Sequence, residues 1–148
     1  MISETASCYC GNISALVTLS RSLAEFQSRC CDCGFCTKHG AAYLSDSAGS
    51  LEIVICDADS TVGYRQGSGA AEFWVCGACG VLVAVTHDQG SKLLGAVNAR
   101  ALSNYHSVTK QQVVSPKTLN RDGKTTRWGE IWFQDVTITV GRRKIFGR

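Results

Sequence analysis

The chain has 148 residues, of which 45% are hydrophobic, and it carries 15 basic and 12 acidic side chains. That length supports one core and is too short for two full-sized domains, so we expect a single domain over residues 1–148. A formal charge of +3, spread without a basic stripe, argues against a nucleic-acid partner. The one concentrated basic run is C-terminal, where a solvated tail is favoured over an RNA-binding arm: Arg142, Arg143, Lys144 and Arg148.

The first twenty residues lack a basic segment followed by an unbroken apolar stretch, so they do not predict a signal peptide. No segment reaches the roughly 18 apolar residues of a membrane span. We therefore expect a cytoplasmic protein without a membrane partner. In such a reducing compartment, nine cysteines indicate metal binding rather than disulfides, and their odd number favours the same interpretation.

Alternating apolar residues predict an all-β chain. In chain order, the expected strands cover residues 13–19, 51–55, 72–76, 81–86, 93–98, 131–134 and 136–140. Residues 22–27 and 99–105 lack alternation, and each is predicted to form a short helical turn. The polar stretch 104–127 is predicted to be a loop or a long hairpin. An ordinary surface excursion is favoured there over a lid.

Seven of the nine cysteines fall into three clusters: Cys8 and Cys10, then Cys31, Cys33 and Cys36, then Cys76 and Cys79. Zinc–thiolate bonds near 2.3 Å place tetrahedral sulfurs roughly 3.8 Å apart, a spacing that a C-x-x-C turn provides. In C-x-C, an ideal strand would hold the two side chains about 6.6 Å apart. The backbone must therefore bend at the first cluster, and Gly11 supplies the freedom.

The number of ligands predicts how the clusters combine. A structural zinc site takes four protein ligands, whereas a catalytic site takes three and keeps an open position. Two doublets and one triplet fit one site of each kind. The four-ligand set would join the N-terminal strand to a distant hairpin: Cys8, Cys10, Cys76 and Cys79. The triplet, being local in sequence, would hold the second zinc in a functional role: Cys31, Cys33 and Cys36.

Two other interpretations of the cysteines are less favoured. A zinc ribbon would pair the C-x-x-C at residues 33–36 with the one at 76–79, leaving Cys8 and Cys10 without a role. A thioredoxin-like redox pair needs a βαβ context, which an all-β chain lacks. The spacing of the clusters therefore favours metal binding over redox chemistry.

Several residues outside the clusters are weaker candidates. His39, three residues past Cys36, would close the second site as a fourth ligand, an alternative to the open position. Cys30 and Cys56 are expected to be buried small hydrophobes, and His87 and His106 surface residues. Core or hairpin packing is expected of Trp74, Trp128 and Trp132. Three cations have the charge to meet a ligand carboxylate, although a solvated surface role is favoured for each: Lys38, Arg65 and Arg100.

Three motifs together resemble the glutathione-dependent formaldehyde-activating enzymes and the related centromere protein V family. They are CYCG at residues 8–11, CDCGFC at 31–36 followed by Lys38 and Gly40, and FWVCGACG at 73–80. Their order and spacing match over roughly the first ninety residues. Two positions depart from the pattern: Asp32 stands where relatives often have histidine, and Thr37 where a basic residue often follows the third cysteine.

The resemblance implies an Mss4-like fold of several packed, coiled β-sheets, with a structural zinc on the four-cysteine set. It implies a second zinc on Cys31, Cys33 and Cys36, at which glutathione is proposed to bind. The implied activity is that of a zinc-dependent carbon–sulfur lyase acting on glutathione or other thiol adducts of aldehydes, such as S-hydroxymethylglutathione formation. Up to two zinc ions per chain and glutathione as thiol co-substrate are therefore expected.

The chemistry of the triplet agrees with that activity. A zinc ion with three thiolates has a net charge of −1, which makes it a poor activator of water. It can still hold a thiol as the thiolate that attacks an aldehyde carbon. The expected partners are thus a small-molecule thiol and an aldehyde adduct. The alternative is a non-catalytic glutathione carrier or protein-interaction module built on zinc, which thiol-dependent turnover would distinguish.

Overall fold

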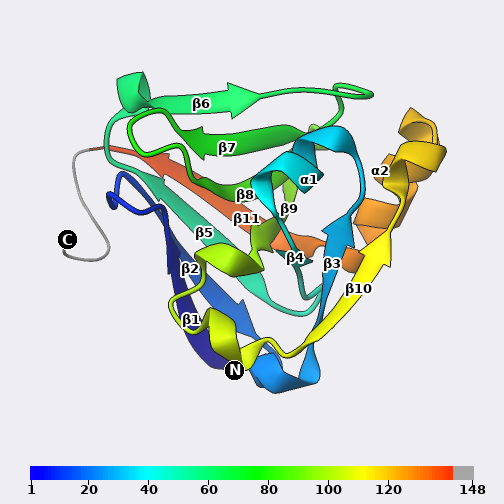
Figure 1. Ribbon diagram of the computed structural model, residues 1–148, viewed down its shortest axis with the longest axis horizontal. Coiled ribbons are helices and arrows are strands. Elements are labelled where there is room, and N and C mark those ends of the chain that lie inside the picture. Colours follow the sequence, from blue (N-terminus) through cyan, green and yellow to red (C-terminus); the bar gives the residue numbers. More distant parts are fainter. Residues whose placement is uncertain (142–148) are drawn as a thin grey trace.

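A computed structural model describes residues 1–141, and the basic run from residue 142 onward lies outside the described residues (Figure 1). The described chain is mostly β-structure, as the sequence predicts, with two α-helices and five 3₁₀ turns that an all-β class does not include. The strands are β1 (Ile2–Ser7), β2 (Ile13–Leu19), β3 (Gln27–Cys31), β4 (Tyr43–Leu44), β5 (Ser50–Ile55), β6 (Thr61–Tyr64), β7 (Glu72–Cys76), β8 (Leu82–Asp88), β9 (Leu93–Asn98), β10 (Lys110–Val114) and β11 (Phe133–Val140). The helical elements are η1 (Leu23–Glu25), α1 (Gly34–His39), η2 (Ala58–Ser60), η3 (Ala99–Ala101), η4 (Tyr105–Ser107), η5 (Pro116–Thr118) and α2 (Arg121–Ile131).

Strand β9 is the branch point of the 11-stranded sheet. Along one edge it pairs antiparallel with β8 from Leu93 to Val97. Its other edge is divided, because Leu93 and Gly95 pair with β11 whereas Val97 and Asn98 pair with β4. A strand has only two edges for hydrogen bonding, so β11 and β4 must lead away from β9 as separate arms.

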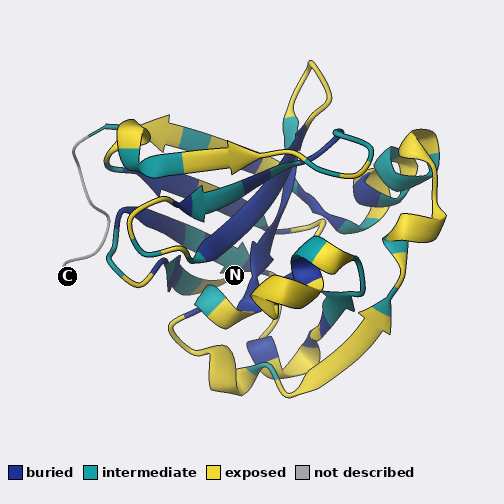
Figure 2. Ribbon diagram, turned by 45° about the horizontal axis from the view of Figure 1, so that its top comes forward, coloured by how far each residue is buried: buried dark blue, intermediate teal, exposed yellow. Residues whose placement is uncertain are grey.

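The first arm runs from β11 through β5 and β2 to β1 and carries the main core. Strand β2 confirms the predicted alternation, since Ile13, Ala15, Val17 and Leu19 are each 0% exposed. Strands β5 and β11 pair in parallel, which requires a long connection between them. That connection holds β6 to β10, and therefore includes the branch strand β9 and the edge strand β10. The buried centre of these strands is dark blue in Figure 2.

The second arm runs from β4 through β3 to β10 and is more exposed. Strand β10 pairs in parallel with β3, in register from Lys110 opposite Gln27 to Val114 opposite Cys31. It forms the outer edge of the sheet and is yellow over most of its length in Figure 2. Cys31, the last residue of β3, is also the first cysteine of the three-cysteine motif, so this arm leads directly into that motif.

The structure corrects the prediction of a loop or hairpin at residues 104–127, which contain β10, η5 and the first part of α2. Asn120 caps α2, because its side-chain oxygen accepts a hydrogen bond from the backbone N–H of Gly123 at 2.8 Å. Asp122 lies in the first turn, where a negative charge is favourable. Asn, Asp and Gly favour turns and helix starts alike, so these residue types alone do not distinguish a turn from the start of α2.

Other boundaries agree more closely. The helical turns predicted at residues 22–27 and 99–105 are present as η1 and η3. The strands predicted at 131–134 and 136–140 form one strand, β11, which begins at Phe133 because Ile131 is the last residue of α2.

Within residues 1–141, no helix combines the length and the apolar character that crossing a bilayer requires. The longest helix there, α2, has 11 residues.

Phe133 tests this account of the core. It is fully buried where β11 meets β9, whereas Val140 on the same strand is 58% exposed. We expect Phe133→Ala to lower the free energy of unfolding by about 3–5 kcal/mol, because it leaves a cavity among packed side chains. Val140→Ala is the control and should change it by no more than about 0.5 kcal/mol. Urea unfolding of both variants measures the two free energies of unfolding. Equal losses would contradict the placement of Phe133 in the core.

Candidate metal centres

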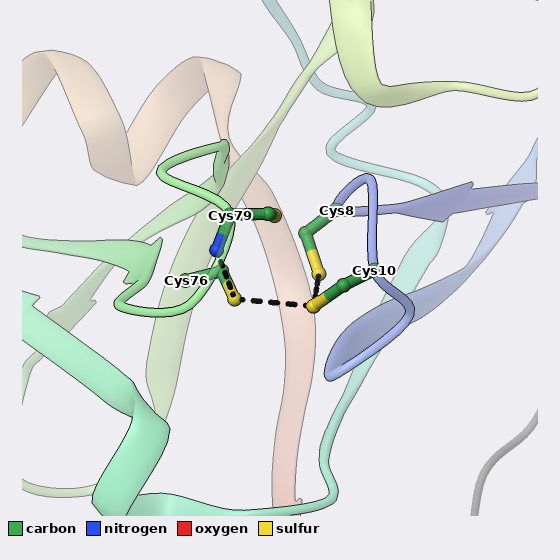
Figure 3. Close-up of side chains that lie close together, drawn as sticks. All are labelled: Cys8, Cys10, Cys76 and Cys79. Atoms are coloured by element: carbon green, nitrogen blue, oxygen red, sulfur yellow. Dashed lines mark hydrogen bonds between the residues drawn. The ribbon is translucent and has the colours of Figure 1, made fainter.

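Four cysteine sulfurs meet between the β1–β2 turn and the β7–β8 turn. Cys8 and Cys10 come from the first turn, and Cys76 and Cys79 from the second (Figure 3). The Sγ atoms of Cys8 and Cys10 are 3.8 Å apart, those of Cys10 and Cys76 are 3.5 Å apart, and all four lie within 4.8 Å of one another. Tetrahedral zinc thiolates need sulfurs roughly 3.8 Å apart. The donor set therefore fits zinc, and the predicted four-cysteine grouping is present.

Two glycines let the turns close in this way. Gly11 has a φ of 85°, which supplies the predicted bend after the C-x-C pair, and Gly80 has a φ of 82° after the C-x-x-C pair. In each turn a backbone N–H points at the first sulfur: Ile13 N lies 3.3 Å from the Sγ of Cys8, and Cys79 N lies 3.4 Å from the Sγ of Cys76. Such N–H groups stabilise thiolates.

The four-cysteine site belongs to the main core. Cys8 and Cys76 are 3% and 0% exposed, and Cys10 and Cys79 pack against the same cluster. Burial raises the pKa of Cys8 to about 12. Burial also acts on Cys79, but hydrogen bonds from the backbone at Cys10 and Val81 and from neighbouring thiols outweigh it and lower the pKa of Cys79 to about 6. A metal ion must therefore displace a proton from Cys8 to complete the site.

The other three clustered cysteines meet where β3 ends and α1 begins. Cys31 is the last residue of β3, Cys33 is the N-cap of α1, and Cys36 lies in its first turn. Their sulfurs lie within 4.8 Å of one another, and the group contains no further ligand atom among the described residues. Cys36 N–H points at the Sγ of Cys33 at 3.4 Å, as a side chain caps a helix. This donor set also fits zinc, with one coordination position left open.

Tyr43 holds the buried member of this triplet. Its Oη lies 3.2 Å from the Sγ of Cys36. Burial, and next the neighbouring Cys36, raise the pKa of Tyr43 well above its ordinary value, so the hydroxyl stays protonated and donates to the sulfur. A hydrogen bond from Cys36 lowers the pKa of Cys31 to about 6, while the same contact raises the pKa of Cys36. The triplet thus already favours one thiolate without a metal.

The histidines differ from the sequence expectations. His39 is exposed at the end of α1, and its ring packs on Phe35 with centroids 4.6 Å apart. It is not part of the triplet, so the closed four-ligand alternative has no support here. His106 is exposed, as expected, but His87 is buried at 9% exposure. The Nδ1–H of His87 donates to the carbonyl oxygen of Ala70 at 2.7 Å.

The two remaining cysteines are not ligands in either described group. Cys30 and Cys56 are of intermediate exposure, so the prediction that they are buried is wrong. None of the seven clustered cysteines is disulfide-bonded. The metal interpretation of the clusters is therefore compatible with their state in the structure.

A cavity of about 400 Å³ opens beside the triplet. The cysteines form part of its lining, and Tyr43, Phe73, Trp128 and Trp132 form much of its apolar wall. The rings of Trp128 and Trp132 are stacked with centroids 4.4 Å apart, which confirms that both pack against other side chains. The four-cysteine site contributes nothing to this lining. The three-cysteine site therefore faces a space that can hold a small ligand.

Five cations of the cavity lining were not predicted from the sequence: Arg29, Lys117, Arg121, Lys124 and Arg127. Three of them recur every third residue, which on a helix places them along one face. That signal was present in the sequence and depended on recognising α2. By contrast, Lys38, Arg65 and Arg100 do not line the cavity. Arg65 instead pairs with Glu72 at 3.6 Å.

No family model matches the chain, and no curated protein matches it either. Among solved structures, a crystal structure of a Rhodobacter sphaeroides protein, determined as a structural genomics target, is similar with a TM-score of 0.58 and 25% sequence identity. The match covers 74% of this chain and 99% of that one. It supports the arrangement of the strands and supplies no activity, so the function must be argued from the site.

The two sites should respond differently to the loss of one ligand. Cys76→Ala removes a fully buried ligand that links segments far apart in sequence, and metal binding in small zinc domains is folding free energy. We expect this variant to lose its cooperative unfolding transition. Cys33→Ala should remain folded and cost about 1 kcal/mol, through loss of the helix cap. Thermal unfolding by circular dichroism, with the zinc content of each variant, measures both. Equal destabilisation would contradict a structural role for one site only.

Proposed function

We propose that the chain is a zinc-dependent carbon–sulfur lyase with an Mss4-like fold, as in the formaldehyde-activating family that it resembles. Its substrates are a small thiol and an aldehyde, joined in an adduct such as S-hydroxymethylglutathione. The observation that carries the proposal is the position of the triplet: three sulfurs line a cavity, and no fourth ligand atom among the described residues completes the group. A ligand from the cavity is placed to complete it.

The contrast between the two sites supports this assignment. The four-cysteine site joins two turns of the main core and leaves no position for a substrate. The triplet is local in sequence, so holding it together contributes little to closing the fold. Grouping three sulfurs costs free energy, and the triplet contributes little to the stability of the chain in return. Ligand binding is therefore the better explanation of the group.

The zinc ion, when bound, would hold the thiol of the substrate in its ionised, nucleophilic form. The chain contributes orientation. Tyr43 donates to Cys36 and the backbone N–H of Cys36 points at Cys33, so both sulfurs are fixed and part of their negative charge is neutralised. Gln66 adds a longer contact to Cys33, its Nε2 lying 3.9 Å from the sulfur. Because these contacts offset negative charge on the three sulfurs, they reduce the repulsion that a fourth thiolate would meet.

The reaction needs no redox partner. In the forward direction the thiol loses its proton, a sulfur–carbon bond forms, and the carbonyl oxygen of the aldehyde gains a proton to become a hydroxyl. The reverse reaction breaks the same bond. Thiols and aldehydes already react unaided, so holding both in one apolar cavity supplies acceleration through proximity. Reduced cysteines are a condition of this chemistry, which is why we place the protein in the cytoplasm.

One observation favours a second candidate, a thiol carrier without turnover. The cavity lining contains no histidine, aspartate or glutamate among the described residues, so the side chains there that could transfer a proton to the aldehyde oxygen are two lysines and Tyr43, whose hydroxyl already contacts Cys36. A carrier needs no such group. Exchange NMR of glutathione and formaldehyde with the zinc protein distinguishes the two, since only an enzyme accelerates adduct formation.

Thiol binding itself is tested with glutathione and S-methylglutathione. The S-methyl compound keeps every carboxylate but cannot form a thiolate, so we expect it to bind at least tenfold more weakly. Glutathione should release about one proton at pH 7, because its thiol is protonated in solution and ionised when bound. Calorimetry in two buffers of different ionisation enthalpy measures both effects. Cys33→Ala should abolish the difference between the two compounds. Equal binding of both by the native protein would contradict the open-site assignment.

A further inference from the structure

The cavity carries an excess of positive charge beyond what the triplet explains. Arg29 reaches it from β3, Arg121, Lys124 and Arg127 reach it from α2, and Lys117, which is paired with Asp32, reaches it from η5. No carboxylate side chain of the described residues belongs to the lining. The negative charge of a zinc-loaded triplet offsets only part of this excess, so the wall of the cavity suits an anion.

Arg29 is held in place on the same side of its strand as a triplet sulfur. It precedes Cys31 by two residues in β3, and side chains two apart on a strand share one face. Its Nη2 donates to the Oγ of Ser45 at 2.7 Å, and Ser45 in turn donates to the carbonyl oxygen of Ile131 at the end of α2. The guanidinium is therefore fixed between β3 and α2 rather than free in solvent.

Arg127 is the cation of α2 on the side of the helix that leads to Arg29. It lies one helical turn before Ile131, whose carbonyl oxygen is joined to Arg29 through Ser45, and both arginines line the cavity. Neither arginine has a carboxylate partner in the described chain, where the ion pairs are Arg65 with Glu72 and Lys117 with Asp32. Two like charges held together without an anion destabilise each other. The two arginines are not free surface cations. The guanidinium of Arg29 is fixed by its hydrogen bond, and the side chains of Arg29 and Arg127 are only partly exposed.

We propose that Arg29 and Arg127 form a carboxylate subsite of the cavity, so that the thiols this site accepts are acidic ones whose carboxylate lies between the two guanidiniums. This rests on the proposed function for the position of the sulfur. The carboxylate reaches the arginines along the same wall that leads from Cys31 to Arg29, and the ligand body packs on the neighbouring face of Trp128. Guanidinium groups bind carboxylates through paired N–H donors, which gives the subsite geometric selectivity as well as charge.

Four small probes separate the carboxylate from the sulfur. They are 3-mercaptopropionate, its neutral amide, and the S-methyl forms of both, titrated by calorimetry into the zinc-loaded protein. We expect the thiol acid to bind roughly tenfold to a hundredfold tighter than the thiol amide, the range for a hydrogen-bonded charge pair. Arg127→Gln should remove most of that preference and leave the affinity for the amide unchanged.

Matched variants give the controls. Arg100→Gln removes an exposed cation outside the lining and should retain the full preference for the acid. Arg127→Lys keeps the charge without the paired donors and should give an intermediate preference, and it serves also if Arg127→Gln fails to fold. Arg29→Lys should reduce the preference in the same direction.

The outcomes separate this proposal from the proposed function. If the thiols bind more tightly than their S-methyl forms but acid and amide bind alike, the carboxylate subsite is wrong and the thiol site stands. If the acids bind more tightly than the amides in both series but the S-methyl forms bind as well as the thiols, the subsite stands and the thiol site is wrong. A preference for the acid that survives both Arg127→Gln and Arg29→Lys overturns the assignment of the two arginines.

Discussion

The contact of four sulfurs between the β1–β2 turn and the β7–β8 turn is the constraint on which the rest of the structure depends. It joins positions 66 residues apart, Cys10 and Cys76, across a chain whose sheet branches at β9. The first turn belongs to the arm that holds the core, and the second to the strands that leave β9 by its other edge. Closing so long a segment costs entropy that a metal ion can offset when it binds only the folded chain.

The second arm, from β4 through β3 to β10, contributes no cysteine to that four-sulfur contact. Strands β3 and β10 lie at the outer edge of the sheet, and α2 follows β10 across the end of β3, where the triplet begins (Figure 1). The parallel pairing of β3 with β10 carries residues from the last third of the chain to the triplet, so Trp128 and Arg127 reach a cavity that residues 31–36 alone cannot build. The cavity is thus assembled from a local motif and a distant helix.

The cysteine sites could be predicted from the sequence because metal ligation leaves a local signal in spacing and number. Buried strands such as β2 and β9 were predicted for a similar reason, since alternation or an apolar run marks them. The polar strand β10 at the edge of the sheet and its neighbour β3 carry no such signal. Most errors at the site trace to α2: its cations were not placed on one face, and His87, whose ring lies 5.4 Å from that of Trp128, was expected at the surface. The contact of Tyr43 with Cys36 depends on the pairing of β4 with β3 and β9, which sequence spacing does not reveal.

The central claim, one closed and one open site, is tested most directly by cadmium-113 NMR of protein in which cadmium replaces zinc. This nucleus reports the number of sulfur ligands at each ion separately. We expect two resonances, of which only one moves toward the four-sulfur region when glutathione is added, and that one should be absent from the Cys33→Ala variant. A single resonance, or two that both ignore the thiol, would contradict the claim.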